Sequence, residues 1–190
     1  SLGQTTGQGF DLQVFNGTGR SFKLAAQSLV VQPLRDEVKR QVQGGMQQLI
    51  RSTSDPITAK INGYCLEFLK APPSAGTLFK MAGPQLQKRF EPMRKIMDAS
   101  RRVQQLGQLR PDSNPEGYFH AVRQWAMWTV EQKLNEKTFA NAFVEHTRKA
   151  VTAARQPWND QAEKVIRSPA PIRWAEIQKI LSAAQVAVQR

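Results

Sequence analysis

Cysteine is nearly missing from this chain, since Cys65 is the single one in 190 residues. A disulfide within the chain is therefore excluded, and so is a zinc site built on several cysteines. Histidine is almost as scarce, with only His120 and His146, and their spacing does not match an H-x-x-x-H metal pair. We therefore expect no bound metal.

Long hydrophobic runs are also missing. None approaches the roughly 20 apolar residues that a membrane-spanning helix needs, so we expect no transmembrane segment. The sequence has neither a Gly-rich nucleotide loop nor a G-x-S-x-G nucleophile motif. It therefore predicts no cofactor and favours a non-enzymatic domain. The alternative is an enzyme whose site is assembled from dispersed residues.

Acidic residues are few, with 15 Asp and Glu against 27 Lys and Arg, which gives a net charge of +12. This excess favours a polyanionic partner such as nucleic acid or an acidic polysaccharide. The most basic segment runs from Lys80 to Arg110, where only Glu91 and Asp98 oppose the positive charges. Its candidate contacts are Lys88, Arg89, Arg94, Lys95, Arg101 and Arg102. The other interpretation is a solvated helix face.

The aromatic residues concentrate in residues 116–133, which hold two of the four tryptophans. On a helix, Tyr118, Val122 and Trp125 form one apolar line, with Trp128 beside it. His120, Arg123 and Met127 fall on the opposite face. We predict that this segment is the central helix of one core, with its tryptophans packed inside.

The N-terminal part differs in its pattern. Residues 1–9 are rich in Gly, Gln and Thr and are predicted to be a flexible lead-in. Residues 10–24 alternate apolar and polar side chains on both sides of Asn16-Gly17, which is typical of a β-hairpin turn. A third strand is predicted at 28–32, so that residues 10–32 form a small β element.

From residue 33 onward the pattern predicts helices. Apolar residues recur every four positions from Leu34 to Met46, and a second apolar helical pattern covers 57–69. A longer helix from Gly83 should kink or split at Pro92. Further helices follow after Asn135, Pro157 and Pro171. We predict a mainly α fold of about six helices packed in one domain over 10–190, with a short N-terminal β-hairpin.

Two short motifs carry a resemblance to a known family. Tyr64-Cys65 and Gln124-x-Ala126-x-Trp128 together resemble the signature of bacterial surface thioester domains, with Met127 where that family usually has isoleucine. In that family the cysteine thiol attacks the glutamine side-chain amide and ammonia is lost. The resulting internal thioester acylates amines on a host target, giving covalent adhesion.

The resemblance implies roles for three residues. Cys65 would be the thiol and Gln124 the acyl donor, and His120, one helical turn before Gln124, could shuttle a proton. The residues alone also allow a buried thiol on a helix face and an amide that bonds a backbone group.

We therefore predict a secreted or surface-exposed binding domain with a macromolecular partner. By the resemblance, the domain would attach covalently to this partner through the thioester. The alternative is a basic helical domain that binds a polyanion.

Overall fold

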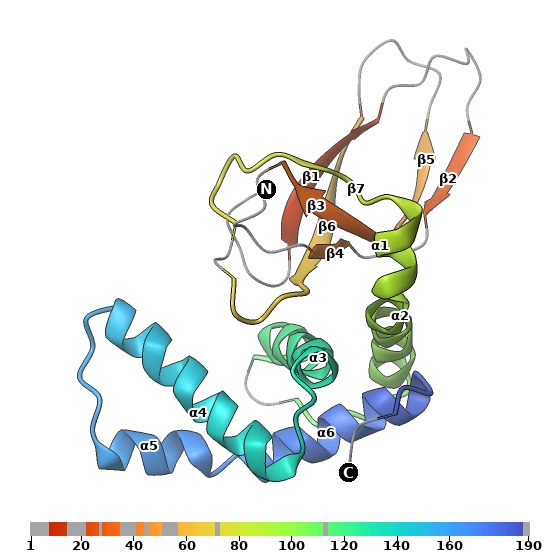
Figure 1. Cartoon of the computed structure of the whole chain (residues 1–190). Helices are drawn as coiled ribbons and strands as arrows, with labels where there is room; N and C mark the ends of the chain where they lie inside the picture. The colour runs from red at the N-terminus through yellow and green to blue at the C-terminus, as the bar shows by residue number, and fades with distance from the viewer. Residues whose placement is uncertain are drawn as a thin grey trace.

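The structure is a computed structural model, and it describes residues 8–14, 22–26, 28–34, 41–43, 46–50, 57–70, 73–111 and 114–187. The strands are β1 (Gln8–Val14), β2 (Phe22–Ala26), β3 (Leu29–Pro33), β4 (Gln41–Gln43), β5 (Met46–Ile50), β6 (Ile57–Cys65) and β7 (Phe79–Met81). The helices are α1 (Pro84–Arg89), α2 (Glu91–Gln105), α3 (Pro115–Glu131), α4 (Glu136–Ala153), α5 (Asp160–Arg167) and α6 (Ala170–Ala183). Figure 1 shows the strands gathered on one side of α2 and α3, with α1 next to the strands and α6 on the opposite side.

The main sheet is antiparallel and has the strand order β1-β6-β4-β3-β7, while β2 and β5 pair separately. Its longest strand, β6, pairs with β1 on one side and with β4 on the other. The two pairings are offset along the strand. Among the residues that the structure describes, pairing with β1 covers Ile57 to Asn62, whereas pairing with β4 covers Gly63 to Cys65.

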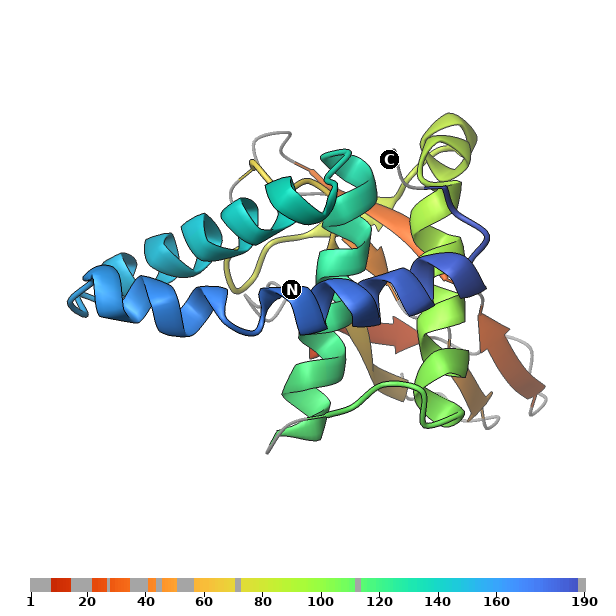
Figure 2. The same ribbon diagram turned by 90° about the horizontal axis from the view of Figure 1, so that it is seen from below.

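The helices form two layers beneath the sheet. α2 and α3 lie side by side, and α6 crosses both of them on the side away from the strands (Figures 1 and 2). α4 and α5 form a hairpin that projects to one side, and α4 also contacts α6. Within the described part of the chain, no helix is long and apolar enough to cross a membrane.

α3 is the helix that the other elements surround. Asn114 caps its start by accepting a hydrogen bond from the Gly117 backbone N–H at 3.1 Å, and Pro115 occupies the first turn. Residues 122–129 are all buried, so the helix is covered on nearly every side. Arg123 and Met127, which were predicted on the face opposite the tryptophans, are buried as well, at 6% and 0% exposure.

One hydrophobic core joins the sheet to the helices. Val30, Tyr64, Cys65 and Leu66 from the strand region belong to the same buried cluster as residues of α2, α3, α4 and α6. Trp125 and Trp128 lie inside this cluster, as predicted, and Trp174 packs against it from a half-buried position. The strand region and the helices therefore cover a shared core.

The mainly α class is confirmed. Several helices could be predicted because local sequence signals mark where they begin or end. Pro92 lies in the first turn of α2, and the predicted long helix divides there into α1 and α2. α4 starts with a capping box, in which the Asn135 side chain and the Thr138 side chain each bond the other's backbone N–H. These local signals act within one helical turn and are readable from sequence.

The predicted β-hairpin is wrong in its pairing. Strands β1 and β2 exist, but β1 pairs with β6 and β2 pairs with β5. The paired residues lie 20 to 54 positions apart, from Ala26 with Met46 to Gln8 with Asn62, so a turn signal between neighbouring strands did not decide the pairing. The predicted turn at Asn16-Gly17 and residues 1–7 of the predicted lead-in lie outside the described residues.

The predicted helices at 34–46 and 57–69 are also wrong, so residues 33–65 are not helical where the structure describes them. They contain β4, β5 and β6, and the first helix begins at Pro84. A spacing of four residues fits a helix, but it is also an even number and therefore keeps side chains on one face of a strand. Ile57, Ile61 and Cys65 follow that spacing along β6, where the β-branched side chains suit a strand.

We expect Phe139→Ala to destabilise the protein by about 3–5 kcal/mol, because it removes a fully buried ring from the core. This ring packs edge-on against Trp125, at 5.4 Å between centroids, and also contacts Phe143. Urea unfolding would measure the change. The matched control is Leu69→Ala, at a side chain that is 80% exposed. Equal unfolding midpoints for the two variants would contradict this account of the core.

Candidate functional site

Cys65 lies at the end of β6, at the junction between the sheet and α3. Its side chain is fully buried, and it is not in a disulfide. The sequence interpretation that placed this thiol on a helix face is therefore wrong, because Cys65 is the last residue of a strand. A strand end is a position where the backbone needs new hydrogen-bond partners.

Gln124 of α3 supplies those partners. Its Oε1 accepts a hydrogen bond from the Cys65 backbone N–H at 2.9 Å, and its Nε2 donates to the Cys65 carbonyl oxygen at 2.7 Å. The Gln124 side chain is 1% exposed, so both bonds are shielded from water. The structure thus brings together the two residues that the thioester resemblance pairs, across 59 positions of sequence.

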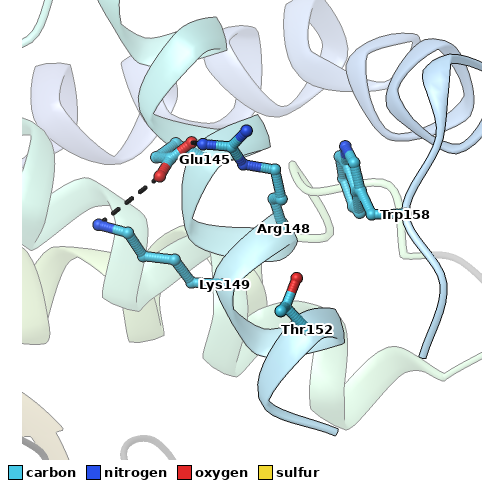
Figure 3. Close-up of a pocket in the computed structure, with 5 residues that line it drawn as sticks. All are labelled: Glu145, Arg148, Lys149, Thr152 and Trp158. Atoms are coloured by element: carbon cyan, nitrogen blue, oxygen red, sulfur yellow. Dashed lines mark ion pairs between the residues drawn. The ribbon is translucent and has the colours of Figure 1, made fainter. Parts of the chain in front are cut away.

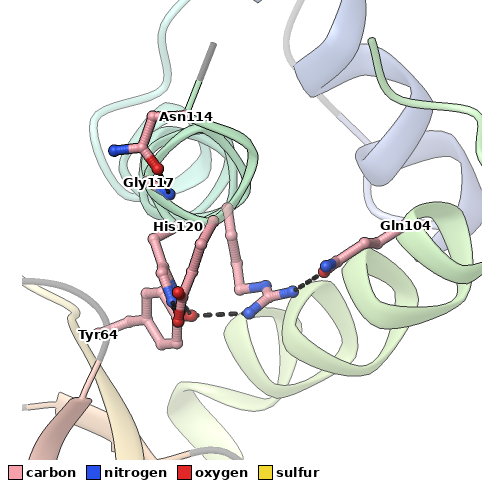
Figure 4. Close-up of polar contacts among 7 residues, drawn as sticks. Tyr64, Gln104, Asn114, Gly117 and His120 are labelled. Carbon is pink, nitrogen blue, oxygen red and sulfur yellow. Dashed lines mark hydrogen bonds and ion pairs between the residues drawn. The ribbon is translucent and has the colours of Figure 1, made fainter. Parts of the chain in front are cut away.

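His120 lies beside the residue that precedes the cysteine. Its Nδ1 contacts the Tyr64 hydroxyl in a short hydrogen bond, and the two rings are tilted, with centroids 5.7 Å apart. Figure 4 shows His120 and Tyr64 facing each other at this contact. The Nε2 atom of His120 is 3.7 Å from Glu116 Oε1, one turn earlier on α3.

Arg123 forms the centre of a polar network between β6, α2 and α3. Its Nη1 donates to the Tyr64 hydroxyl oxygen at 2.6 Å, its Nη2 to Gln104 Oε1 at 3.0 Å, and its Nε to the Ser100 hydroxyl at 2.5 Å. Dashed lines in Figure 4 mark the contacts of this group at Tyr64 and at Gln104. Its partners in the described part of the chain are neutral oxygens, so the positive charge is buried without a carboxylate contact.

The surroundings set the protonation of Tyr64 and His120. Burial raises the pKa of the Tyr64 hydroxyl, and the charge and hydrogen bond of Arg123 oppose the rise. Burial lowers the pKa of His120, and the charge of Arg123 lowers it further, against the opposing effect of Glu116. Both shifts favour a neutral phenol beside a neutral imidazole.

An aromatic cluster adjoins the same part of α3. Phe68, just after β6, packs edge-on against Trp128 at 4.9 Å between centroids, and Trp125 and Trp128 pack edge-on at 5.2 Å. His146 of α4 lies against both tryptophans and Phe68. These rings pack in and against the core beside the face of α3 that carries Trp125 and Trp128.

The predicted polyanion contacts differ in their exposure and in their hydrogen-bond or ion-pair partners. Arg94 donates to the Ser28 carbonyl oxygen at 2.7 Å, Lys95 pairs with Glu91 at 3.1 Å, and Arg101 is half-buried. Arg102 is exposed and reaches the Ala183 carbonyl oxygen at 3.4 Å. Lys88 and Arg89 are exposed at the end of α1. Only part of the predicted set is therefore directed to solvent.

An open pocket lies elsewhere, on the α4–α5 hairpin (Figure 3). It is lined by Glu145, Arg148, Lys149, Thr152 and Trp158. Both cations are ion-paired with Glu145, at 2.6 Å and 3.7 Å, which reduces the charge that a ligand would meet. Trp158 is half-buried at this pocket.

Sequence reasoning missed the polar network around Arg123. The sequence offered one signal, an arginine directly before Gln124 within an aromatic segment, and that arginine was assigned to the face away from the tryptophans. Ser100 and Gln104 carry no motif, and they join the network only because α2 packs beside α3. In the described part of the chain, no group of three His, Cys, Asp or Glu side chains could hold a metal ion.

We expect acid to destabilise the fold through His120. Because the folded His120 has a lowered pKa, the unfolded chain binds a proton first as the pH falls through the ordinary histidine value of about 6.5. The free energy of unfolding should therefore decrease from that pH down to the folded pKa. Urea unfolding of the wild type and of His120→Gln across this range would measure it. An identical acid loss in both proteins would rule out His120 as the source.

Comparison with known proteins yields no relative. No protein-family model matches the chain, and neither the curated proteins nor the solved structures include a significant match. The function must therefore be argued from the chemistry of the Cys65–Gln124 site.

Proposed function

We propose that this domain forms an internal thioester between Cys65 and Gln124 and uses it to attach covalently to amines on a macromolecular partner. The supporting observation is the double hydrogen bond between the Gln124 amide and the Cys65 backbone, at 2.9 and 2.7 Å. It holds the amide beside the only cysteine of the chain. These bonds are to the Cys65 backbone, and the proposal requires the Cys65 Sγ to reach Gln124 Cδ from that position, where proximity would supply a large part of the barrier reduction.

The reaction balances without a cofactor. The Cys65 Sγ attacks Gln124 Cδ, the new S–C bond replaces the Cδ–Nε2 bond, and the thiol proton leaves with the nitrogen as ammonia. An amine on the partner then attacks the same carbon, forms an amide and returns the proton and the thiol to Cys65. No oxidant or reductant takes part.

Burial suits both steps of this chemistry. Cys65 and Gln124 are 0% and 1% exposed, so water is kept from the thioester carbon until the site opens. A large partner must therefore displace part of the covering structure to bring its amine to the thioester carbon, whereas a small amine such as methylamine needs less displacement. A single cysteine also means that no intramolecular disulfide competes for the thiol. The same features fit a secreted or surface-exposed protein.

The thioester makes a prediction about the intact mass. We expect the native protein to weigh less than its sequence by one ammonia molecule and to show no titratable thiol. After incubation with methylamine, the mass should rise by one methylamine and one thiol should appear. Intact mass spectrometry with thiol titration measures both changes.

Two variants and one control sharpen this test. Cys65→Ala and Gln124→Glu should keep the full mass of their sequences and not couple methylamine, because one lacks the nucleophile and the other lacks the ammonia leaving group. Gln105→Glu makes the same change at an exposed glutamine of α2 and should behave as the wild type. A native wild type with full mass and a free thiol would refute the proposal.

Polyanion binding is a second candidate, favoured by the net charge of +12 and by the exposure of Lys88 and Arg89 on α1. If this surface is used, heparin binding should weaken steeply with salt, and Lys88→Glu with Arg89→Glu should reduce the salt slope by about two. Lys133→Glu and Lys137→Glu, exposed near the start of α4, are the control. Equal heparin affinities for the two double variants would exclude α1 as the contact.

A further inference from the structure

The Arg123 network connects the immediate neighbours of the two thioester residues. Tyr64 precedes Cys65 on β6, Arg123 precedes Gln124 on α3, and the two are joined by the hydrogen bond of 2.6 Å from Nη1 to the phenol oxygen. β6 and α3 are thus held together by the Gln124 amide, by this pair and by the contact of the Tyr64 hydroxyl with His120. A change in the Tyr64–Arg123 contact would shift the Gln124 amide relative to Cys65.

The proton positions in this network follow from the donors. Ser100 donates its hydroxyl proton to the Met97 carbonyl oxygen at 2.8 Å, so it can accept from Arg123. Arg123 only donates, so the Tyr64 oxygen accepts from it and the phenol proton is left for His120 Nδ1. Nδ1 must then carry no proton, which places the imidazole hydrogen on Nε2.

A second proton on His120 would break this arrangement. Nδ1 would become a donor, the Tyr64 hydroxyl would lose its acceptor, and a new cation would stand beside the buried charge of Arg123. Arg101 of α2 adds positive charge near Tyr64. The opposing group is Glu116, whose side chain is 89% exposed and 3.7 Å from Nε2, so water weakens its effect.

We propose that Arg123, Tyr64 and His120 form a positioning network that holds Gln124 against Cys65 only while His120 is neutral, so that acid prevents the thioester from forming. The inference rests on the proposed thioester and adds its regulation by pH. Burial and the Arg123 charge, which lower the pKa of His120, keep the network intact at neutral pH. His120 acts through Tyr64 and is a positioning residue. This role does not require His120 to contact the reacting atoms.

The test follows re-formation of the thioester. Ammonium chloride reverses the first reaction, because ammonia attacks the thioester and regenerates the Gln124 amide and the Cys65 thiol. After ammonia is removed, the mass loss and the disappearance of the thiol are followed from about pH 5 to about pH 8. We expect the His120-dependent loss of the wild-type rate to be about tenfold per pH unit below the pKa of His120, in proportion to its neutral fraction.

Three variants separate an effect on the position of Gln124 from a general loss of protein stability. His120→Gln keeps a neutral acceptor for the Tyr64 proton and should re-form the thioester without the His120-dependent acid loss, so that only the fall due to protonation of the attacking Cys65 thiolate remains. Tyr64→Phe should be slower at every pH, because Arg123 and His120 are no longer linked. His146→Gln, at the other histidine, should keep the wild-type profile. Circular dichroism at each pH shows that the compared proteins are folded.

The outcomes distinguish the two proposals. A wild-type acid loss that is steeper than that of His120→Gln supports the network. The same acid loss in His120→Gln, or a wild type that reacts with ammonium but never re-forms the thioester, overturns the network and leaves the thioester standing. A wild type that never contained the thioester overturns both.

Discussion

The structure depends on one contact, the pair of hydrogen bonds by which the Gln124 side chain binds both backbone groups of Cys65. Cys65 is the last residue of β6, and both bonds to it are buried. They join the end of this strand to α3. Gln124 holds this position because α3 is itself fixed, by the cap at its start and by the packing of α2 and α6 against it.

Arg123 shows a second constraint on the same contact. Burying a guanidinium costs free energy unless its nitrogen atoms are hydrogen-bonded. Here each of the three nitrogens of Arg123 donates to a neutral oxygen. Those oxygens belong to α2 and β6, so the charge is satisfied only when both elements are correctly placed against α3. The network therefore favours one arrangement of the three elements over nearby alternatives, and it lies one residue away from each member of the Cys65–Gln124 pair. Structure and proposed chemistry thus depend on the same side chains.

Much of the helical region was predictable because its signals are local. The break at Pro92 and the cap at Asn135 each operate within one turn. The N-terminal half was not predictable in the same way. Ile57, Ile61 and Cys65 repeat every four residues, which suits either a helix or one face of a strand, and only the partners of β6 decide between them. The pairing of β1 with β6 likewise depends on contacts that no short stretch of sequence contains.

The sequence by itself determined the chemical inventory: one thiol, two imidazoles, a basic excess, and a glutamine set among tryptophans in a helix. It also determined that this helix would be central, because so much aromatic surface must be buried. Only the tertiary structure decided that Gln124 meets Cys65 and that Arg123 joins Tyr64 to α2. The reason is physical, since these contacts span tens of residues and exist only when the sheet and the helices close over a common core.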